Sequence, residues 1–124
     1  MLEIIKERLD EAAIFHLSGR INLEKTAQLR EMFWVCLDQE RVKKLIIDLA
    51  GVPSLDPSSV SLLVSTKNVV TKYRAELVLV GLNTGNYAML EKTHLHFYFD
   101  IRADVTQALG EKPAPPPPPT RDRR

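Results

Sequence analysis

The chain has 124 residues, of which 44% are apolar and 27% are charged, which is enough for one packed domain and too few for two. Seventeen Lys and Arg residues against sixteen Asp and Glu residues leave a formal charge of +1, so no strong field would attract nucleic acid or an anionic membrane. The apolar runs are short and the start has no signal-peptide pattern, which predicts a soluble, cytoplasmic protein without membrane insertion.

The first twenty residues predict two strands, consistent with a hairpin. Apolar and polar positions alternate around Leu2 and Ile4 and again from Ala13 to Leu17. The polar stretch 7–11 separates the two runs and is expected to be a break between them.

Two helices and two buried strands are predicted between residues 22 and 81. Asn22 is placed to cap a first helix, whose apolar residues recur with helical spacing at Leu29, Met32, Phe33, Cys36 and Leu37. Within residues 43–49, Leu45, Ile46, Ile47 and Leu49 form a nearly uninterrupted apolar run, as in a central strand that is covered on both faces. A second helix is predicted from Pro57 to about Tyr73, because Asp56 followed by Pro is a strong start signal. Residues 77–80 predict the next buried strand.

The remaining elements complete an α/β fold. We expect a polar loop at 83–86, a short helix at 87–93, a last strand at 97–101 and a short helix at 104–109. Strands that alternate with helices require crossover connections. The sequence therefore predicts a mixed, mostly parallel sheet of about five strands with the alternating helices packed on it.

A proline-rich tail is predicted to follow the folded domain. The domain is expected to span residues 1–111, and residues 112–124 read Lys-Pro-Ala, five prolines and Thr-Arg-Asp-Arg-Arg. Such a sequence lacks the apolar side chains of a core and favours the extended polyproline helix. It can serve as a solvated spacer or as a ligand for an aromatic groove of a partner.

Several motifs, in their order and spacing, resemble those of the STAS domains, the family of bacterial anti-sigma-factor antagonists and of the cytoplasmic tails of sulfate transporters. The motifs are Gly19-Arg20-Ile21-Asn22, Leu45-Ile46-Ile47-Asp48-Leu49 and Leu55-Asp56-Pro57-Ser58-Ser59, followed by the segments 90–99 and 104–109. The resemblance covers nearly everything before the tail. It implies a STAS-like fold and a function in partner switching.

In that family an antagonist binds a kinase-type anti-sigma factor, which releases its sigma factor, and phosphorylation of the antagonist ends the binding. The acceptor is a Ser or Thr directly after the Asp that begins the second helix. Here that position is Pro57, which has no hydroxyl. Ser58 and Ser59 are the phosphoacceptor candidates that remain, although Ser59 falls on the arc expected to face the core. Asp56 is interpreted as a helix cap rather than a catalytic base.

The resemblance places a partner-binding surface on this turn and on the helix that follows it. Val60 and Val64 are expected to be exposed beside Pro57, either as a contact patch or as ordinary surface apolar residues. Trp34 falls off the main apolar arc of the first helix and could anchor a partner or pack under a neighbouring segment. The expected partner-binding residues are Asn22, Asp56, Pro57, Ser58, Val60, Val64 and Lys67.

The sequence does not predict an enzyme or a cofactor. It contains no recognisable nucleophile with its base, paired carboxylates of a pocket, or phosphate loop. His94 and His96 have the spacing of a metal pair but no third ligand near them in sequence, which favours surface or capping roles. His16 is interpreted as a structural histidine in its strand, and Cys36 as a buried, unreactive thiol.

Two other functions remain open at the level of sequence. The first is a non-phosphorylated STAS subunit of a signalling or lipid-transport complex, which Pro57 favours because the docking shape would remain without the acceptor. The second is a domain that recognises a small apolar ligand in an internal pocket. Partner switching with an anti-sigma factor or serine-kinase-type protein is the main hypothesis, and the tail is a candidate site for another partner.

Overall fold

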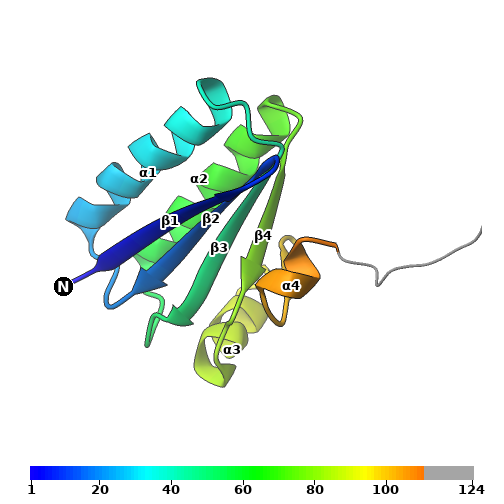
Figure 1. Cartoon of the computed structure of the whole chain (residues 1–124). Coiled ribbons are helices and arrows are strands. Elements are labelled where there is room, and N and C mark those ends of the chain that lie inside the picture. The colour runs from blue at the N-terminus through cyan, green and yellow to red at the C-terminus, as the bar shows by residue number, and fades with distance from the viewer. Residues whose placement is uncertain (111–124) are drawn as a thin grey trace, which may run out of the picture.

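The structure is a computed structural model that describes residues 1–110, which form a five-stranded sheet and four helices (Figure 1). The strands are β1 (Glu3–Leu9), β2 (Ala12–Ser18), β3 (Lys44–Gly51), β4 (Glu76–Val80) and β5 (Asp100–Arg102). The helices are α1 (Leu23–Asp38), α2 (Pro57–Lys72), α3 (Thr84–Lys92) and α4 (Val105–Ala108). The predicted tail, residues 112–124, lies outside the described residues.

The predicted mixed, mostly parallel sheet is confirmed. The strands lie in the order β1-β2-β3-β4-β5, with β1 antiparallel to β2 and every other pair parallel. β3 occupies the centre, as its nearly continuous apolar sequence predicts. Because β2, β3 and β4 are parallel, their carboxyl ends meet at one edge of the sheet. The starts of α1, α2 and α3 therefore gather at that edge.

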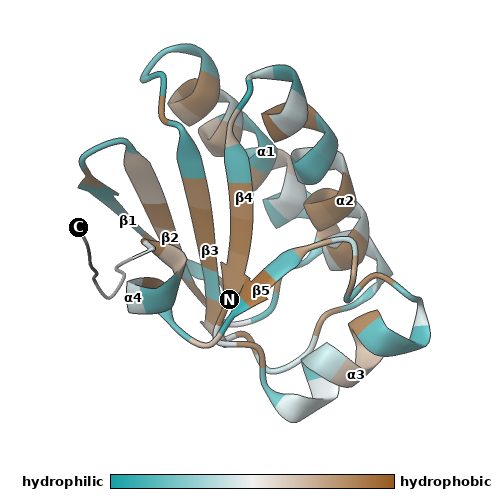
Figure 2. Cartoon of the chain, turned by 90° about the vertical axis from the view of Figure 1, so that its right-hand side faces the viewer, coloured by the Kyte–Doolittle hydropathy of each residue, from teal (hydrophilic) through white to brown (hydrophobic). Residues whose placement is uncertain are grey.

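The two faces of the sheet are covered by different amounts of helix. α1 and α2 lie side by side on one face and bury most of the core (Figures 1 and 2), where the rings of Phe15 and Phe33 meet edge to face at 4.9 Å. On the opposite face, α4 covers a smaller buried cluster. The Lys44 ammonium donates to the Ala108 carbonyl at 2.7 Å and holds the end of this short helix. The smaller cluster consists of Ala12, Ile14, Ile46, Val78, Val80 and Ala108.

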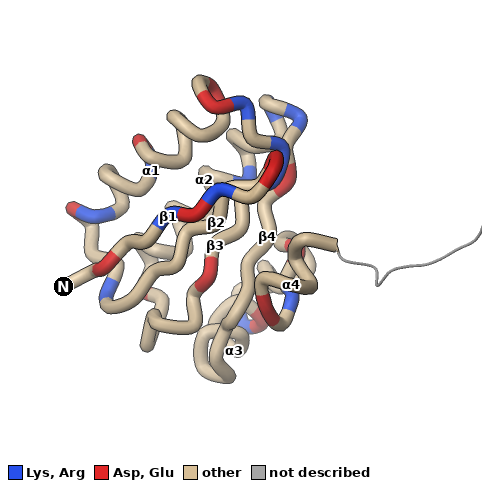
Figure 3. The backbone as a smooth tube through the Cα atoms, viewed as in Figure 1, with Lys and Arg blue, Asp and Glu red and all other residues tan. Residues whose placement is uncertain are grey.

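β1 continues through part of the stretch that the sequence predicts as a polar break. The strand extends to Leu9, and the chain turns at Asp10 with a φ of 53°. β1 is an edge strand that is mostly exposed, so polar side chains do not interrupt its pairing with β2. Figure 3 shows acidic and basic residues alternating along it.

α3 begins at Thr84, so the prediction of a polar loop at 83–86 is wrong. Asn83 caps the helix, because its side-chain oxygen accepts a hydrogen bond from the Asn86 backbone N–H at 2.7 Å. Residues 84–86 therefore form the first turn of the helix. The cap signal in the sequence is Asn83, a residue type that favours helix N-termini as well as loops.

The last strand is shorter than predicted. β5 comprises only residues 100–102, and residues 97–99 belong to a turn. The Leu95 carbonyl accepts the Tyr98 backbone N–H at 3.0 Å, which curls the chain away from the sheet. Within residues 1–110, no helix is long and apolar enough to cross a membrane.

Candidate functional site

The start of α2 forms a tightly bonded corner around Asp56. The Asp56 carboxylate accepts the Ser59 backbone N–H at 2.9 Å and lies 2.9 Å from the hydroxyls of both Ser58 and Ser59. These hydrogen bonds, the Ser59 N–H foremost, lower the pKa of Asp56. The carboxylate is thus ionised near neutral pH and committed to capping the helix.

The two serines of the corner differ in accessibility. Ser59 is only 1% exposed, and its hydroxyl also lies 3.2 Å from the Ile21 carbonyl. Ser58 is half-buried and donates its hydroxyl to Asp56, while Pro57 beside it is exposed. Of the two phosphoacceptor candidates, Ser58 is therefore the one near the surface.

Asn22 lies at the same end of the molecule as this corner. It caps α1 by accepting the Lys25 backbone N–H at 2.9 Å. The contact between Ser59 and the Ile21 carbonyl joins the residue before Asn22 to the first turn of α2. The structure thus brings together two candidate partner-binding segments that are more than thirty residues apart in sequence.

Two asparagines at the start of α3 fix the loop that leads into the corner. The buried Asn86 side chain donates to the Val52 carbonyl at 3.0 Å and accepts the Leu55 N–H at 2.9 Å. Asn83 donates to the Pro53 carbonyl at 3.2 Å. The sequence interpretation gave these asparagines no part in the site, because a contact some thirty residues distant leaves no local pattern.

An apolar groove runs beside the corner, between α2 and α3. Pro57, Val60 and Val64 line it together with Met89 of α3, and its volume is about 540 Å³. The prediction that the valines are exposed is wrong: both are half-buried and pack against the core. The reason is that α3 approaches this side of α2, so the patch is recessed rather than raised.

Lys67 lies further along α2 and is engaged by an aromatic ring. Its ammonium sits 5.8 Å from the centre of the Tyr98 ring. The Tyr98 hydroxyl donates to Asn68 of the same helix at 2.9 Å. These contacts bring the turn before β5 against α2, so Lys67 lies next to this turn.

Trp34 does not belong to the corner. It is partly exposed and lines a separate hollow of about 140 Å³ between α1 and α2, together with Phe33 and Thr66. Cys36 on the same helix is fully buried, and burial raises the pKa of its thiol, as expected for an unreactive cysteine.

The histidines occupy two different environments. His16 lies between two carboxylates, with Nε2 2.8 Å from Glu7 and Nδ1 2.7 Å from Asp48, and these hydrogen bonds raise its pKa. His94 and His96 lie in the turn after α3 instead of an extended segment. In the part of the chain that the structure describes, no group of three or more His, Cys, Asp or Glu side chains could hold a metal ion.

Comparison with known proteins identifies the family. The family model of the STAS domain matches residues 3–108. Similar solved structures include an anti-sigma factor antagonist from Mycobacterium paratuberculosis, with 19% identity, a TM-score of 0.76 and coverage of 88% of this chain and 92% of the other. A putative anti-sigma factor antagonist from Thermotoga maritima has 18% identity, a TM-score of 0.80 and coverage of 90% and 95%.

A third similar structure is the Bacillus cell fate determinant SpoIIAA in its phosphorylated form, with 16% identity, a TM-score of 0.70 and coverage of 86% of this chain and 96% of the other. At such identities these structures establish a common fold. The family match, in contrast, covers most of the sequence and includes the motifs at residues 19–22, 45–49 and 55–59. The chain therefore belongs to the STAS domain family, as those motifs predict.

Proposed function

We propose that this STAS domain is a partner-switching protein of the anti-sigma factor antagonist type, which binds an anti-sigma factor or serine-kinase-type protein through the corner at Asp56 and the groove beside it. It acts by binding and catalyses no reaction of its own. The observation that carries the proposal is the pinned corner, in which exposed Pro57 leads directly into an apolar groove.

The fixed backbone of the corner favours docking. Asp56 holds the first turn of α2, and Asn86 holds the loop before it, so little chain entropy remains to be lost when a partner binds. The recessed valines Val60 and Val64 offer apolar surface to a protruding side chain or helix of the partner. Asn22 and Lys67 extend the proposed contact area to the start of α1 and along α2.

Phosphorylation of Ser58 is the proposed regulation of this contact. The Ser58 hydroxyl lies 2.9 Å from the ionised Asp56, so a phosphate there would add nearly two negative charges beside an existing one. The helix N-terminus offers backbone N–H groups to a phosphate, which allows the fold to survive. The partner would instead meet a repulsive surface that is costly to desolvate.

A second function, a constitutive STAS subunit of a signalling or lipid-transport complex, is favoured by one specific observation. Pro57 occupies the position where a hydroxyl is expected, and Ser58 already uses its hydroxyl to bond Asp56. In that case the corner would dock its partner permanently.

Purification of the native protein with its bound chains, followed by mass spectrometry, tests both functions. The partner-switching proposal expects a co-purified kinase-type chain that, with ATP, places phosphate on Ser58 and then dissociates, and Ser58→Ala should abolish both effects. A bound partner without phosphate would favour the constitutive subunit.

The binding surface itself is tested by Val64→Asp, with Ile5→Asp as the matched control. Ile5 is also apolar and is 57% exposed, but it lies on β1, away from α2. We expect Val64→Asp to abolish capture of the purified partner and Ile5→Asp to retain it, with unchanged circular dichroism in both. Retained capture by a folded Val64→Asp variant would contradict the proposed surface for either function.

A further inference from the structure

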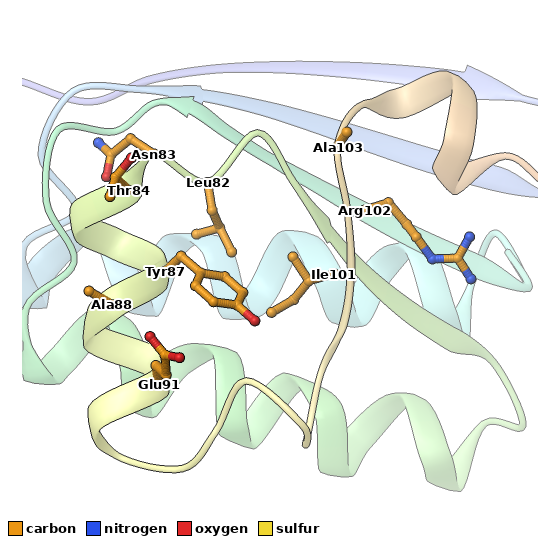
Figure 4. Close-up of a pocket in the computed structure, with 9 residues that line it drawn as sticks. All are labelled: Leu82, Asn83, Thr84, Tyr87, Ala88, Glu91, Ile101, Arg102 and Ala103. Atoms are coloured by element: carbon orange, nitrogen blue, oxygen red, sulfur yellow. The ribbon is translucent and has the colours of Figure 1, made fainter.

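A second pocket lies on the side of α3 that faces β5, separate from the groove along α2. Its volume is about 480 Å³. Leu82 and Ile101 give it apolar walls, Tyr87 contributes an aromatic ring, and Glu91 lies on its rim (Figure 4). In Figure 4 the Tyr87 ring extends from α3 toward Ile101, across the hollow.

The chemistry of this pocket suits a proline-rich segment with a flanking arginine. Proline rings in an extended polyproline helix pack on aromatic side chains such as Tyr87, which is 39% exposed. The Glu91 carboxylate can pair with a guanidinium at the rim. Arg102, the basic residue of the lining, pairs with Asp100 at 2.6 Å and points away from the hollow (Figure 4), so it does not neutralise Glu91.

We propose that this pocket binds the chain's own prolines, Pro115–Pro119, with Arg121 directed to Glu91. The sequence provides five consecutive prolines and places an arginine two residues after them. No other stretch of the chain has this composition. The segment would dock within the same molecule, on a surface distinct from the proposed partner-binding corner.

The chain is long enough for this contact. Ala103 lines the pocket, and α4 separates it from Gly110 by seven residues. Only four of these residues are helical, so at rises of about 1.5 Å in the helix and about 3.3 Å outside it Gly110 lies within roughly 16 Å of Ala103. The eleven residue steps from Gly110 to Arg121 cover up to roughly 34 Å at the polyproline rise of about 3.1 Å per residue, about twice the return path to Ala103.

Paramagnetic relaxation in the full-length protein tests this proposal. A nitroxide attached to Thr120→Cys should broaden the backbone amide signals of Ala88, Glu91 and Arg102, but not those of α1. Cys36 is fully buried, so the introduced thiol should react selectively. Absence of broadening around the pocket would overturn the proposal.

A mixed sample distinguishes docking of the proline segment within its own molecule from docking into the pocket of a second copy. It contains nitrogen-15-labelled protein without nitroxide and unlabelled protein that carries it. We expect no broadening in this mixture. Broadening in the mixture equal to that in the singly labelled sample would overturn docking within the same chain and assign the pocket to a second copy.

Two further variants test the chemistry. Tyr87→Ala should abolish the broadening, whereas Phe97→Ala should retain it, because Phe97 is a nearby aromatic residue that is 88% exposed and outside the pocket lining. The fivefold variant Pro115→Ser, Pro116→Ser, Pro117→Ser, Pro118→Ser and Pro119→Ser should also abolish the broadening without altering the domain. A free peptide of residues 112–124 should then bind this serine variant several-fold more tightly than the natural chain, whose attached segment competes at an effective concentration on the order of 1 mM. Equal peptide binding by both proteins would contradict the proposal.

Discussion

One face of the sheet packs against two sixteen-residue helices, whereas within residues 1–110 the opposite face carries only the four-residue helix α4. The first face is apolar, with Phe15 and its neighbours buried under the two helices. On the second face, the polar group of Glu7, His16 and Asp48 links β1, β2 and β3 by side-chain hydrogen bonds. The difference indicates that most of the buried apolar surface lies in the helical layer, while the thinly covered face combines a smaller apolar cluster with this polar group.

Truncation of one side chain on each face of the sheet gives the largest expected difference in the free energy of unfolding. Phe15→Ala should lower the free energy of unfolding by about 3–5 kcal/mol, because it leaves a cavity opposite Phe33. Ile5→Ala removes a largely exposed side chain and should cost less than about 0.5 kcal/mol. Urea denaturation measures both, and similar losses would refute the unequal roles of the two faces.

Asn86→Ala extends the comparison to the link between α3 and the corner. It leaves the buried Leu55 N–H and the Val52 carbonyl without their hydrogen-bond partner. We expect a loss of about 1–3 kcal/mol in the free energy of unfolding. The exchange of the Leu55 amide hydrogen with solvent should accelerate more than that of amides in β3. The comparison variant Asn83→Ala removes the helix cap and the hydrogen bond to the Pro53 carbonyl but leaves both side-chain contacts of Asn86, so a smaller acceleration of Leu55 exchange is expected there.

Removal of the cap of α2 should have a smaller effect. Asp56→Ala should cost about 1 kcal/mol of unfolding free energy, because the Ser59 N–H loses its acceptor. Asp56→Asn keeps a side-chain oxygen at the same place and should recover most of that loss. If thermal unfolding shows both variants equally destabilised, the carboxylate would be more than a helix cap.

The smallest expected effect concerns the polar group of the thinly covered face. The raised pKa of His16 means that its stabilising contribution is complete below the ordinary histidine pKa of about 6.5 and is lost as pH rises through the raised value. His16→Gln should therefore differ more from the natural protein at pH 6 than at pH 9 in urea denaturation. A difference that grows toward pH 9 would contradict the roles of Glu7 and Asp48.

The sequence predicts the fold because its local and long-range signals agree. The apolar run of β3, the helical period of α1 and the Asp56-Pro57 start of α2 each correspond to an element of the structure. The edge elements are less predictable, since the ends of β1 and β5 depend on pairing and on turn contacts such as that of Leu95 with Tyr98.

The candidate site is predicted in position but not in shape. The motif around Asp56 marks the corner, yet Val60 and Val64 become recessed only because α3 folds back beside α2. The contacts of Asn86 likewise arise from tertiary structure and have no local sequence pattern. The pocket around Tyr87 joins α3 to β5 and becomes visible only once the chain is folded.

The charges along β1 oppose growth of the sheet by addition of a second copy. Antiparallel pairing of two β1 strands must place residues of the same face opposite each other. Pairing centred on Lys6 sets this lysine against itself, and pairing centred on Glu7 also opposes Lys6 to Arg8. Pairing centred on Ile5 brings Glu3 against Glu7. Like charges directly opposite each other are destabilising. The charged side chains of β1 therefore protect the protein from edge-to-edge aggregation into fibres.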